Sequence, residues 1–203
     1  MRTILCAAIC LLTGCLARPH LDKQSFIFAP PSPPAVGGAS AGRVLGIRTL
    51  QVAALFDGRP FVYRIGEYSY ERDPYAEFME PPAEALVAPI GNWFRATGGF
   101  SAVVEPGSAL KPNTLVEIQV VQLYGDFRPS QPPAAVLDMR FAFFGVSNGV
   151  PGMVVLQREY SRGIPLKART AAALVAGWNQ ALAQILDSAM QDFKRPGATT
   201  PKP

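Results

Sequence analysis

The chain has 203 residues, of which 49% are hydrophobic and 17% charged, and its formal net charge is +4. This length suits one sizeable domain and scarcely two. The basic residues are scattered, without a clustered stripe or a recognisable module, which argues against nucleic acid as a partner. A catalytic histidine, a Cys–His pair and a His or Cys zinc site are excluded beyond residue 23, because the residues they need all lie earlier: Cys6, Cys10, Cys15 and His20.

The N-terminal segment has the pattern of a secretory signal. Arg2 is the only charge before an apolar run from Ile4 to Leu12, which is far shorter than the ~20 residues of a membrane-spanning helix. The run ends at Leu12-Thr13-Gly14-Cys15, which resembles the bacterial lipobox. This resemblance implies cleavage before Cys15 and acylation of that cysteine on its sulfur, with palmitate as the expected group, and on its new amine. Several acyl chains together give stable anchoring.

Ordinary secretion is the alternative. Cys15-Leu16-Ala17 has a small residue at either end, and cleavage after Ala17 would leave a soluble protein without cysteine. In Gram-negative lipoproteins an Asp at the position of Leu16 usually signals inner-membrane retention, so its absence favours the periplasmic face of the outer membrane. We expect a signal peptide at 1–14, a lipid-anchored tether at 15–23, one domain at 24–195 and a disordered tail at 196–203.

The first half of the domain predicts strands joined by loops rich in proline and glycine. A Pro/Gly-rich surface loop is expected at Pro30–Gly42, a helical turn at Val52–Asp57 and a break in the strand pattern at Asp73-Pro74. The predicted strands are Gln24–Ala29, Arg43–Gln51, Pro60–Ile65 and Tyr68–Arg72.

A first helix is predicted after Pro81-Pro82, where a missing N–H costs nothing. Gly98-Gly99 ends it, and Pro89 falls inside it, so the helix is either kinked or split into two short pieces. Its apolar positions follow helical spacing: Ala83, Leu86, Ile90, Trp93 and Phe94.

The second half predicts an antiparallel meander and a closing helix. A switch of the apolar face at Val121 indicates a bulge, and Ser147-Asn148-Gly149 supplies a hairpin turn. The predicted strands are Phe100–Val104, Thr114–Tyr124, Ala134–Phe144 and Met153–Tyr160. The last helix runs to Arg195 and repeats apolar residues every three or four positions: Leu174, Trp178, Leu182, Ile185, Ala189 and Phe193.

The stretches Asp57–Arg64 and Tyr70–Phe78, followed by Pro81-Pro82 and an amphipathic helix, resemble the auxiliary lipoproteins of ABC-type transport systems, the PqiC-like group. The resemblance covers most of the chain, although Phe78 stands where many members carry Trp, and Pro30–Gly42 looks like an insertion. It implies an α/β single domain, with a mixed, largely antiparallel sheet and two long helices packed on it, similar to the TolB amino-terminal domain.

The resemblance also implies a function. The protein would be an accessory of an MCE-type (Mla-like) system that moves lipids between the inner and outer membranes. It would dock the periplasmic MCE-domain protein, which works with an ABC permease and ATPase. It would make or break no bond and need no cofactor or metal, and a homo-oligomer is open by analogy. A small-ligand or lipid-binding module is the alternative, and it would require a large apolar cavity.

Other residues admit a functional and a structural interpretation, and we favour the structural one. Six carboxylates could act in acid–base catalysis, or they could simply lie in solvent at a strand edge and a helix start. They are Glu67, Glu71, Asp73, Glu77, Glu80 and Glu84. Nine aromatic residues have a functional or a core interpretation. Six could form a protein-binding face: Phe61, Tyr63, Tyr68, Tyr70, Tyr75 and Phe78. Phe141, Phe143 and Phe144 could line a lipid groove, but such a run is more often the buried face of a central strand. Arg59 and Arg64 could bind phospholipid head groups or could serve surface solubility. A lipid-modifying hydrolase is another functional class, and its only Ser–Lys candidates would be Ser101, Ser108 and Lys111.

Overall fold

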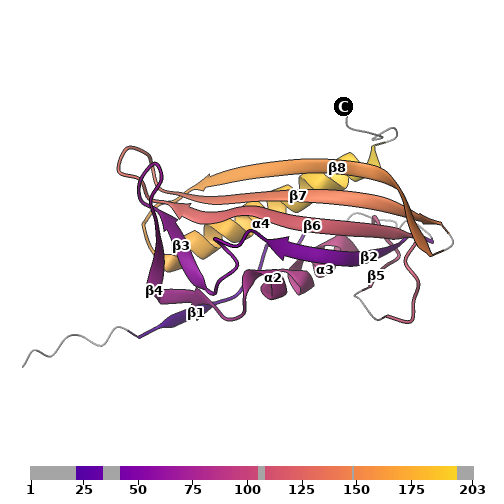
Figure 1. The fold of residues 1–203 in the computed structure, drawn as a ribbon, viewed down its shortest axis with the longest axis horizontal. Coiled ribbons are helices and arrows are strands. Elements are labelled where there is room, and N and C mark those ends of the chain that lie inside the picture. The colour runs from indigo at the N-terminus through magenta and orange to yellow at the C-terminus, as the bar shows by residue number, and fades with distance from the viewer. Residues whose placement is uncertain (1–21, 34–41, 105–107, 148, 196–203) are drawn as a thin grey trace, which may run out of the picture.

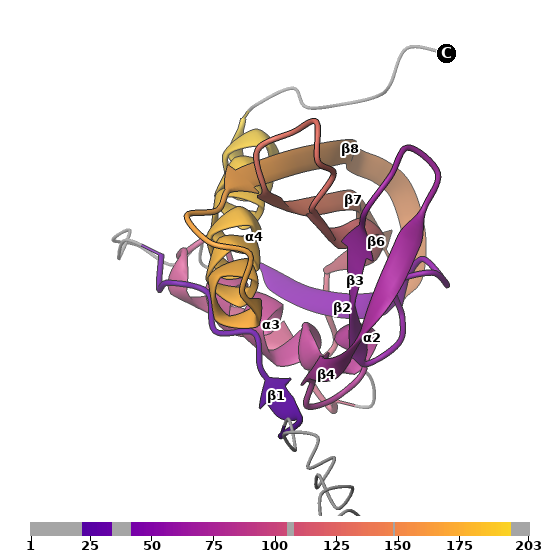
Figure 2. The same cartoon turned by 90° about the vertical axis from the view of Figure 1, so that its left-hand side faces the viewer.

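A long, curved sheet forms the body of the molecule, and helices close its open side (Figure 1, Figure 2). The computed structural model describes residues 22–33, 42–104, 108–147 and 149–195. The described elements are, in order, β1 (Gln24–Phe26), β2 (Val44–Val52), β3 (Pro60–Arg64), β4 (Tyr70–Phe78), α2 (Pro82–Ala85), α3 (Val87–Ala96), β5 (Ala102–Val104), β6 (Thr114–Asp126), β7 (Ala134–Ser147), β8 (Val150–Pro165) and α4 (Ala171–Lys194). The predicted mixed α/β single domain is confirmed.

Strand β6 is the centre of the eight-stranded sheet of the described residues. One of its edges pairs with β7, antiparallel, and β7 pairs with β8 in the same way. Its other edge pairs with both β2 and β3, which run parallel to it. Strand β2 pairs in turn with β5, and β3 pairs with β4. The longest ladders are thus antiparallel, and the predicted meander is confirmed.

The predicted bulge lies in β6, where the register shifts between Val120 and Gln122. The extra residue changes which side chains face the core, as the switch of apolar face indicates. The β7–β8 hairpin closes at the pair Ser147 and Val150, and Gly149 has a φ of +78°, which suits a two-residue turn. Asn148 lies outside the described residues.

The first strand docks on the domain as predicted, because β1 runs parallel to β4 with Phe26 opposite Phe78. It is shorter than expected, since it ends at Phe26. The predicted break at Asp73-Pro74 is wrong, because β4 continues to Phe78. The Asp73 carboxylate accepts hydrogen bonds from the backbone N–H groups of Tyr75 and Ala76, at 2.7 and 3.0 Å, and these replace ladder bonds.

The helix after Pro81 consists of two short pieces, one of the two predicted outcomes. Pro82 is the first residue of α2, and the pieces meet at Leu86. Pro89 therefore lies in the first turn of α3, where its missing N–H leaves no bond unmade. The expected helical turn begins after Val52, because β2 runs one residue further than predicted, and it is closed by a hydrogen bond from Phe56 N to Ala53 O.

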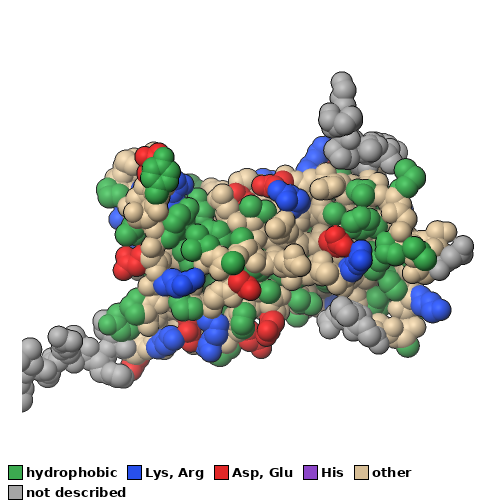
Figure 3. Space-filling model, in the orientation of Figure 1, with side chains coloured by type: hydrophobic (Ala, Val, Ile, Leu, Met, Phe, Trp, Pro, Cys, Tyr) green, Lys and Arg blue, Asp and Glu red, His purple; other side chains and the backbone are tan. Residues whose placement is uncertain are grey.

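The core lies between the curved sheet and the helices. Helix α4 has 24 residues and is capped at its N-terminus by Thr170, whose hydroxyl accepts from Ala173 N at 3.2 Å. All six apolar residues predicted for its inner face are buried, and they pack on β7 residues such as Phe141 and Phe143, which have no exposed surface. On the face seen in Figure 3, charged groups of both signs are interspersed, which agrees with the scattered basic residues of the sequence.

Candidate functional site

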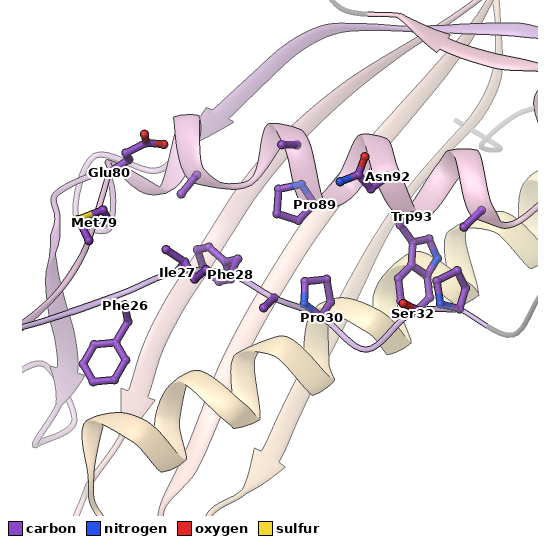
Figure 4. A pocket seen from close by; sticks show the side chains of 15 residues that line it. Phe26, Ile27, Phe28, Pro30, Ser32, Met79, Glu80, Pro89, Asn92 and Trp93 are labelled. Carbon is purple, nitrogen blue, oxygen red and sulfur yellow. The ribbon is translucent and has the colours of Figure 1, made fainter.

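A groove of about 540 Å³ lies between α2–α3 and the segment that follows β1 (Figure 4). This volume falls in the ~300–1,000 Å³ range of small-molecule sites in proteins. Most of its lining is apolar, and the polar exceptions are Ser32, Glu80 and Asn92. The full lining is Phe26, Ile27, Phe28, Ala29, Pro30, Ser32, Pro33, Met79, Glu80, Ala85, Ala88, Pro89, Asn92, Trp93 and Ala96.

One wall of the groove is a segment that leaves the sheet at Phe26 and extends beside α3. β1 has already ended at Phe26, and the prolines that follow, Pro30, Pro31 and Pro33, cannot donate to a sheet ladder. Two contacts hold the segment in place. Phe28 stacks on Phe78 with ring centroids 4.8 Å apart, and Ala29 N donates to Asn179 Oδ1 of α4 at 2.9 Å.

The groove contains one unusual polar group. Trp93 is only 5% exposed, and its indole Nε1 is the one buried side-chain polar atom without a hydrogen-bond partner in the part of the chain described. The other tryptophan, Trp178, donates to the carbonyl of Val136 at 3.1 Å. A buried donor without an acceptor is rare in folded proteins. The groove therefore combines apolar walls with one buried donor that has no acceptor in the described part of the chain.

Apolar side chains remain exposed at the opposite end of the groove from Trp93. Ile27 is 61% exposed and Met79 55%, and both line the groove beside Glu80. Sequence reasoning missed this site. It assigned Trp93 to the core face of a helix and Ile27 to a strand, and the only available signal was that Gln24–Ala29 carries more aromatic and apolar residues than a three-residue strand needs.

The six predicted carboxylates do not form a centre. Glu77 is 6% exposed and pairs with Arg59 Nη2 and Lys23 Nζ, each at 2.5 Å, while Asp73 accepts from Tyr63 Oη at 2.5 Å. Burial, followed by this bond to Asp73, raises the pKa of Tyr63 well above its usual range. The other four are exposed: Glu67, Glu71, Glu80 and Glu84. Among the described residues no group of three or more His, Cys, Asp or Glu could hold a metal ion.

The aromatic residues divide as the structural interpretation predicted. Phe61, Phe78, Phe141 and Phe143 are core, and Phe144 and Tyr63 are half-buried. Tyr68, Tyr70 and Tyr75 are exposed.

The remaining candidates have structural partners. Arg64 donates to the carbonyls of Gly66 and Glu67. Ser101 Oγ donates to the carbonyl of Arg43 at 3.0 Å, and Ser108 Oγ accepts from Leu110 N at 3.3 Å.

Cys15 lies outside the described residues, as do the signal segment, most of the tether and the tail. These expectations therefore stay predictions. None of the helices in residues 22–33, 42–104, 108–147 and 149–195 is long and apolar enough to span a membrane.

Comparison with known proteins identifies the family. The model of the ABC-type transport auxiliary lipoprotein component matches residues 26–189. The fold is similar to that of a Xanthomonas campestris protein of family DUF330, with a TM-score of 0.67 at 20% identity, over 82% of this chain and 93% of that one. A second solved structure, described as an uncharacterized protein, has a TM-score of 0.62 at 14% identity, over 85% and 99%. Curated proteins gave no match. The chain therefore belongs to the family of ABC-type transport auxiliary lipoprotein components.

Proposed function

We propose that this protein is a non-catalytic lipoprotein of the outer membrane, which docks the periplasmic MCE-domain partner of an ABC-type system that moves lipids between membranes. The family match over residues 26–189 carries the coarser statement, an auxiliary lipoprotein component of an ABC-type transport system. The lipobox-like Leu12-Thr13-Gly14-Cys15 supports the anchor, with Cys15 as the acylated residue. The resemblance to the PqiC-like group supports the MCE protein, its permease and its ATPase as partners.

The tether limits how the domain sits on the membrane. Nine residues lead from Cys15 to Gln24, and they span at most about 30 Å when fully extended. The tether ends on a strand of the sheet, since β1 pairs with β4 and Phe26 packs on Phe61 with ring centroids 5.4 Å apart. The end of the molecule that carries β1 therefore stays close to the membrane in this proposal.

The opposite end of the molecule carries the β7–β8 hairpin (Figure 1). Met153 is 79% exposed and Val150 64%, and Figure 3 shows hydrophobic side chains gathered at this end. Exposed apolar patches commonly mark protein contacts. A partner that reaches across the periplasm from the inner membrane would meet this end first, so we propose it as the docking surface.

Co-purification from cells tests the proposal. The acylated protein should recover the MCE protein encoded beside it, and replacing Val150 and Met153 together by Ser should lower this recovery about tenfold, as loss of buried interface anchors does. The matched control is Tyr68→Ser, because Tyr68 is 88% exposed at the β3–β4 hairpin and should not matter. Failure of the unmodified protein to recover any MCE protein, with its anchor retained, would contradict the docking role.

A ligand- or lipid-binding module is the second candidate function. Phe141 and Trp178, in the core between the sheet and α4, are fully buried. The groove beside Trp93 lies outside this core and is large enough for a small molecule. Binding there is compatible with the docking role, because the groove and the β7–β8 hairpin are different surfaces.

A further inference from the structure

The groove is long. One wall runs along the helices from Ala85 to Ala96, which corresponds to about 16 Å at 1.5 Å per residue. The other wall is the extended segment, with Ile27 and Phe28 beside α2 and Ser32 beside the end of α3 (Figure 4). Such a channel suits a single extended hydrocarbon chain better than a compact ring system.

The exposed lining also favours hydrocarbon. Ile27 and Met79 leave more than half of their surface in water, although both lie on the groove. On the helical wall, the small side chains of Ala85, Ala88 and Ala96 leave space in the groove for a ligand. An apolar ligand laid over these residues would remove their surface from water, which is favourable.

Trp93 provides the polar contact that such a ligand would need. Its N–H is buried without an acceptor among the described residues, and its indole projects from α3 towards the segment that holds Ser32 (Figure 4). An ester or carboxyl oxygen is an acceptor, and pairing with it would remove the cost of the unmet donor. A pure hydrocarbon would leave that donor unmet.

The charged side chains near the two ends of the groove differ in sign. At the Trp93 end, Lys194 Nζ donates to the carbonyl of Thr97 at 3.0 Å, one helical turn beyond Trp93. Asn92, which lines the groove, accepts a hydrogen bond from the Arg95 guanidinium through its Oδ1 at 2.5 Å. The positive side chains favour a negatively charged head group at this end.

The other end is less suited to an anion. The carboxylate of Glu80 lines the groove there and would repel one. The nearby cations Lys23 and Arg59 already pair with Glu77. The head group of an anionic lipid is therefore expected beside Trp93, and its tail beside Ile27.

From this arrangement we propose that the groove binds one acyl chain of an anionic lipid drawn from the membrane, with a carbonyl or carboxyl oxygen of the lipid accepting from Trp93 Nε1. The protein's own anchor is disfavoured as the occupant. Its chains would arrive from Cys15 through β1, so their carbonyl groups would lie at the Glu80 end. The inference rests on the proposed function for the origin of the lipid, but the groove itself carries the binding.

Direct binding of palmitate tests the proposal. The full-length Cys15→Ala protein, which carries no anchor, is titrated with palmitate by calorimetry, and bound lipid is identified by native mass spectrometry. We expect one palmitate per chain and about fivefold weaker binding for Trp93→Phe, which removes the N–H donor but keeps an aromatic ring. Ala88→Trp, which fills the groove at an exposed position, should abolish binding. Hexadecanol, which has the same chain without the charge, should bind more weakly than palmitate.

Met153→Ser, far from the groove, is the control and should bind palmitate normally, while circular dichroism confirms that each variant is folded. Three results would overturn the proposal: no palmitate bound to Cys15→Ala, binding unaffected by both groove variants, or native spectra of the acylated protein in which its own chain or a peptide excludes added palmitate. The docking role is scored separately. Ala88→Trp should still recover the MCE protein, so failure of the lipid-binding proposal can be distinguished from failure of the docking proposal.

Discussion

The carboxylate of Asp192 accepts a hydrogen bond from the phenol of Tyr160, with 2.9 Å between Oδ2 and Oη. The same oxygen accepts from Arg158 Nη1 at 2.7 Å, and Arg195 lies 3.2 Å from the other carboxylate oxygen. Asp192 is 9% exposed. A buried acid therefore joins the last turn of α4 to β8, the strand at one edge of the sheet.

Replacing Asp192 by Asn should destabilise the protein by about 1–2 kcal/mol, because charge-assisted bonds to Tyr160 and Arg158 are lost. We expect a loss at the lower end of the range for hydrogen bonds to charged groups, because the Arg158 side chain is 54% exposed and water screens its charge. Urea unfolding measures the change. The control is Asp187→Asn on the same helix, because Asp187 is exposed and accepts only from Gln191 among the contacts described. Equal losses for the two variants would contradict this account.

The contribution of Asp192 should depend on pH. Burial raises the pKa of its carboxyl group, but the hydrogen bonds from Arg158 and Tyr160 outweigh burial and hold the pKa below the ordinary 3.8. A lowered pKa in the folded state contributes stability above the unfolded value, and this is lost as pH falls through the folded value. The difference between the natural protein and Asp192→Asn should persist at pH 7 and shrink below about pH 4. Urea unfolding at several pH values tests this.

Asp138 should behave in the opposite way. Burial raises its pKa, and the hydrogen bond from Ser161 offsets only part of this. Since the folded pKa lies above the unfolded one, the ionised group disfavours folding at neutral pH, and this cost disappears as pH falls. Asp138→Asn, whose amide oxygen can still accept from Ser161, should unfold at equal or higher urea concentration at pH 7 and lose any advantage in acid. A clear destabilisation at pH 7 would show that the charge itself is needed.

Close packing of α4 on the sheet should make Gly177 intolerant of a methyl group. A Cβ at this position would lie 2.6 Å from Ala135 Cβ and 2.9 Å from Leu166 Cδ2. Gly177→Ala should therefore destabilise by about 1–3 kcal/mol through overpacking, although Ala is the better helix former. The control is Gly163→Ala on β8, where a Cβ would meet nothing within 4 Å. Thermal unfolding compares the two, and a stabilised Gly177→Ala would contradict the packing described.

Sorting of the lipoprotein should depend on Leu16. If the protein is acylated at Cys15 and sorted to the outer membrane as proposed, Leu16→Asp is expected to move it to the inner membrane fraction, because Asp after the lipidated cysteine usually retains lipoproteins there. Leu16→Ser should stay in the outer membrane, and Cys15→Ala should leave the membrane fraction as a folded, soluble domain. Sucrose-gradient fractionation separates these outcomes. If the Leu16→Asp and Leu16→Ser proteins fractionate alike, the assignment to the outer membrane loses its basis.

Local patterns predicted most elements correctly because their causes are local. Alternation in β7 and the three-to-four spacing in α4 each report which face is buried, and the change at Val121 marked a real bulge. The error at Asp73-Pro74 has a tertiary cause. Asp73 and Pro74 suggest a break, but the Asp73 side chain accepts hydrogen bonds from the backbone of Tyr75 and Ala76, and the β3–β4 register shifts at this point.

The sequence by itself determined the family and the succession of strands and helices, and it predicts a secretory signal with a lipobox-like motif at Cys15, because each depends on residues close together in the chain. The groove depends on the tertiary structure. Phe28 and Trp93 are 65 positions apart, and they line one cavity only because β1 docks on β4 and Asn179 of α4 holds Ala29. Helical spacing indicated that Trp93 would be buried. Whether its N–H would find an acceptor was decided by the residues that the fold brings around it.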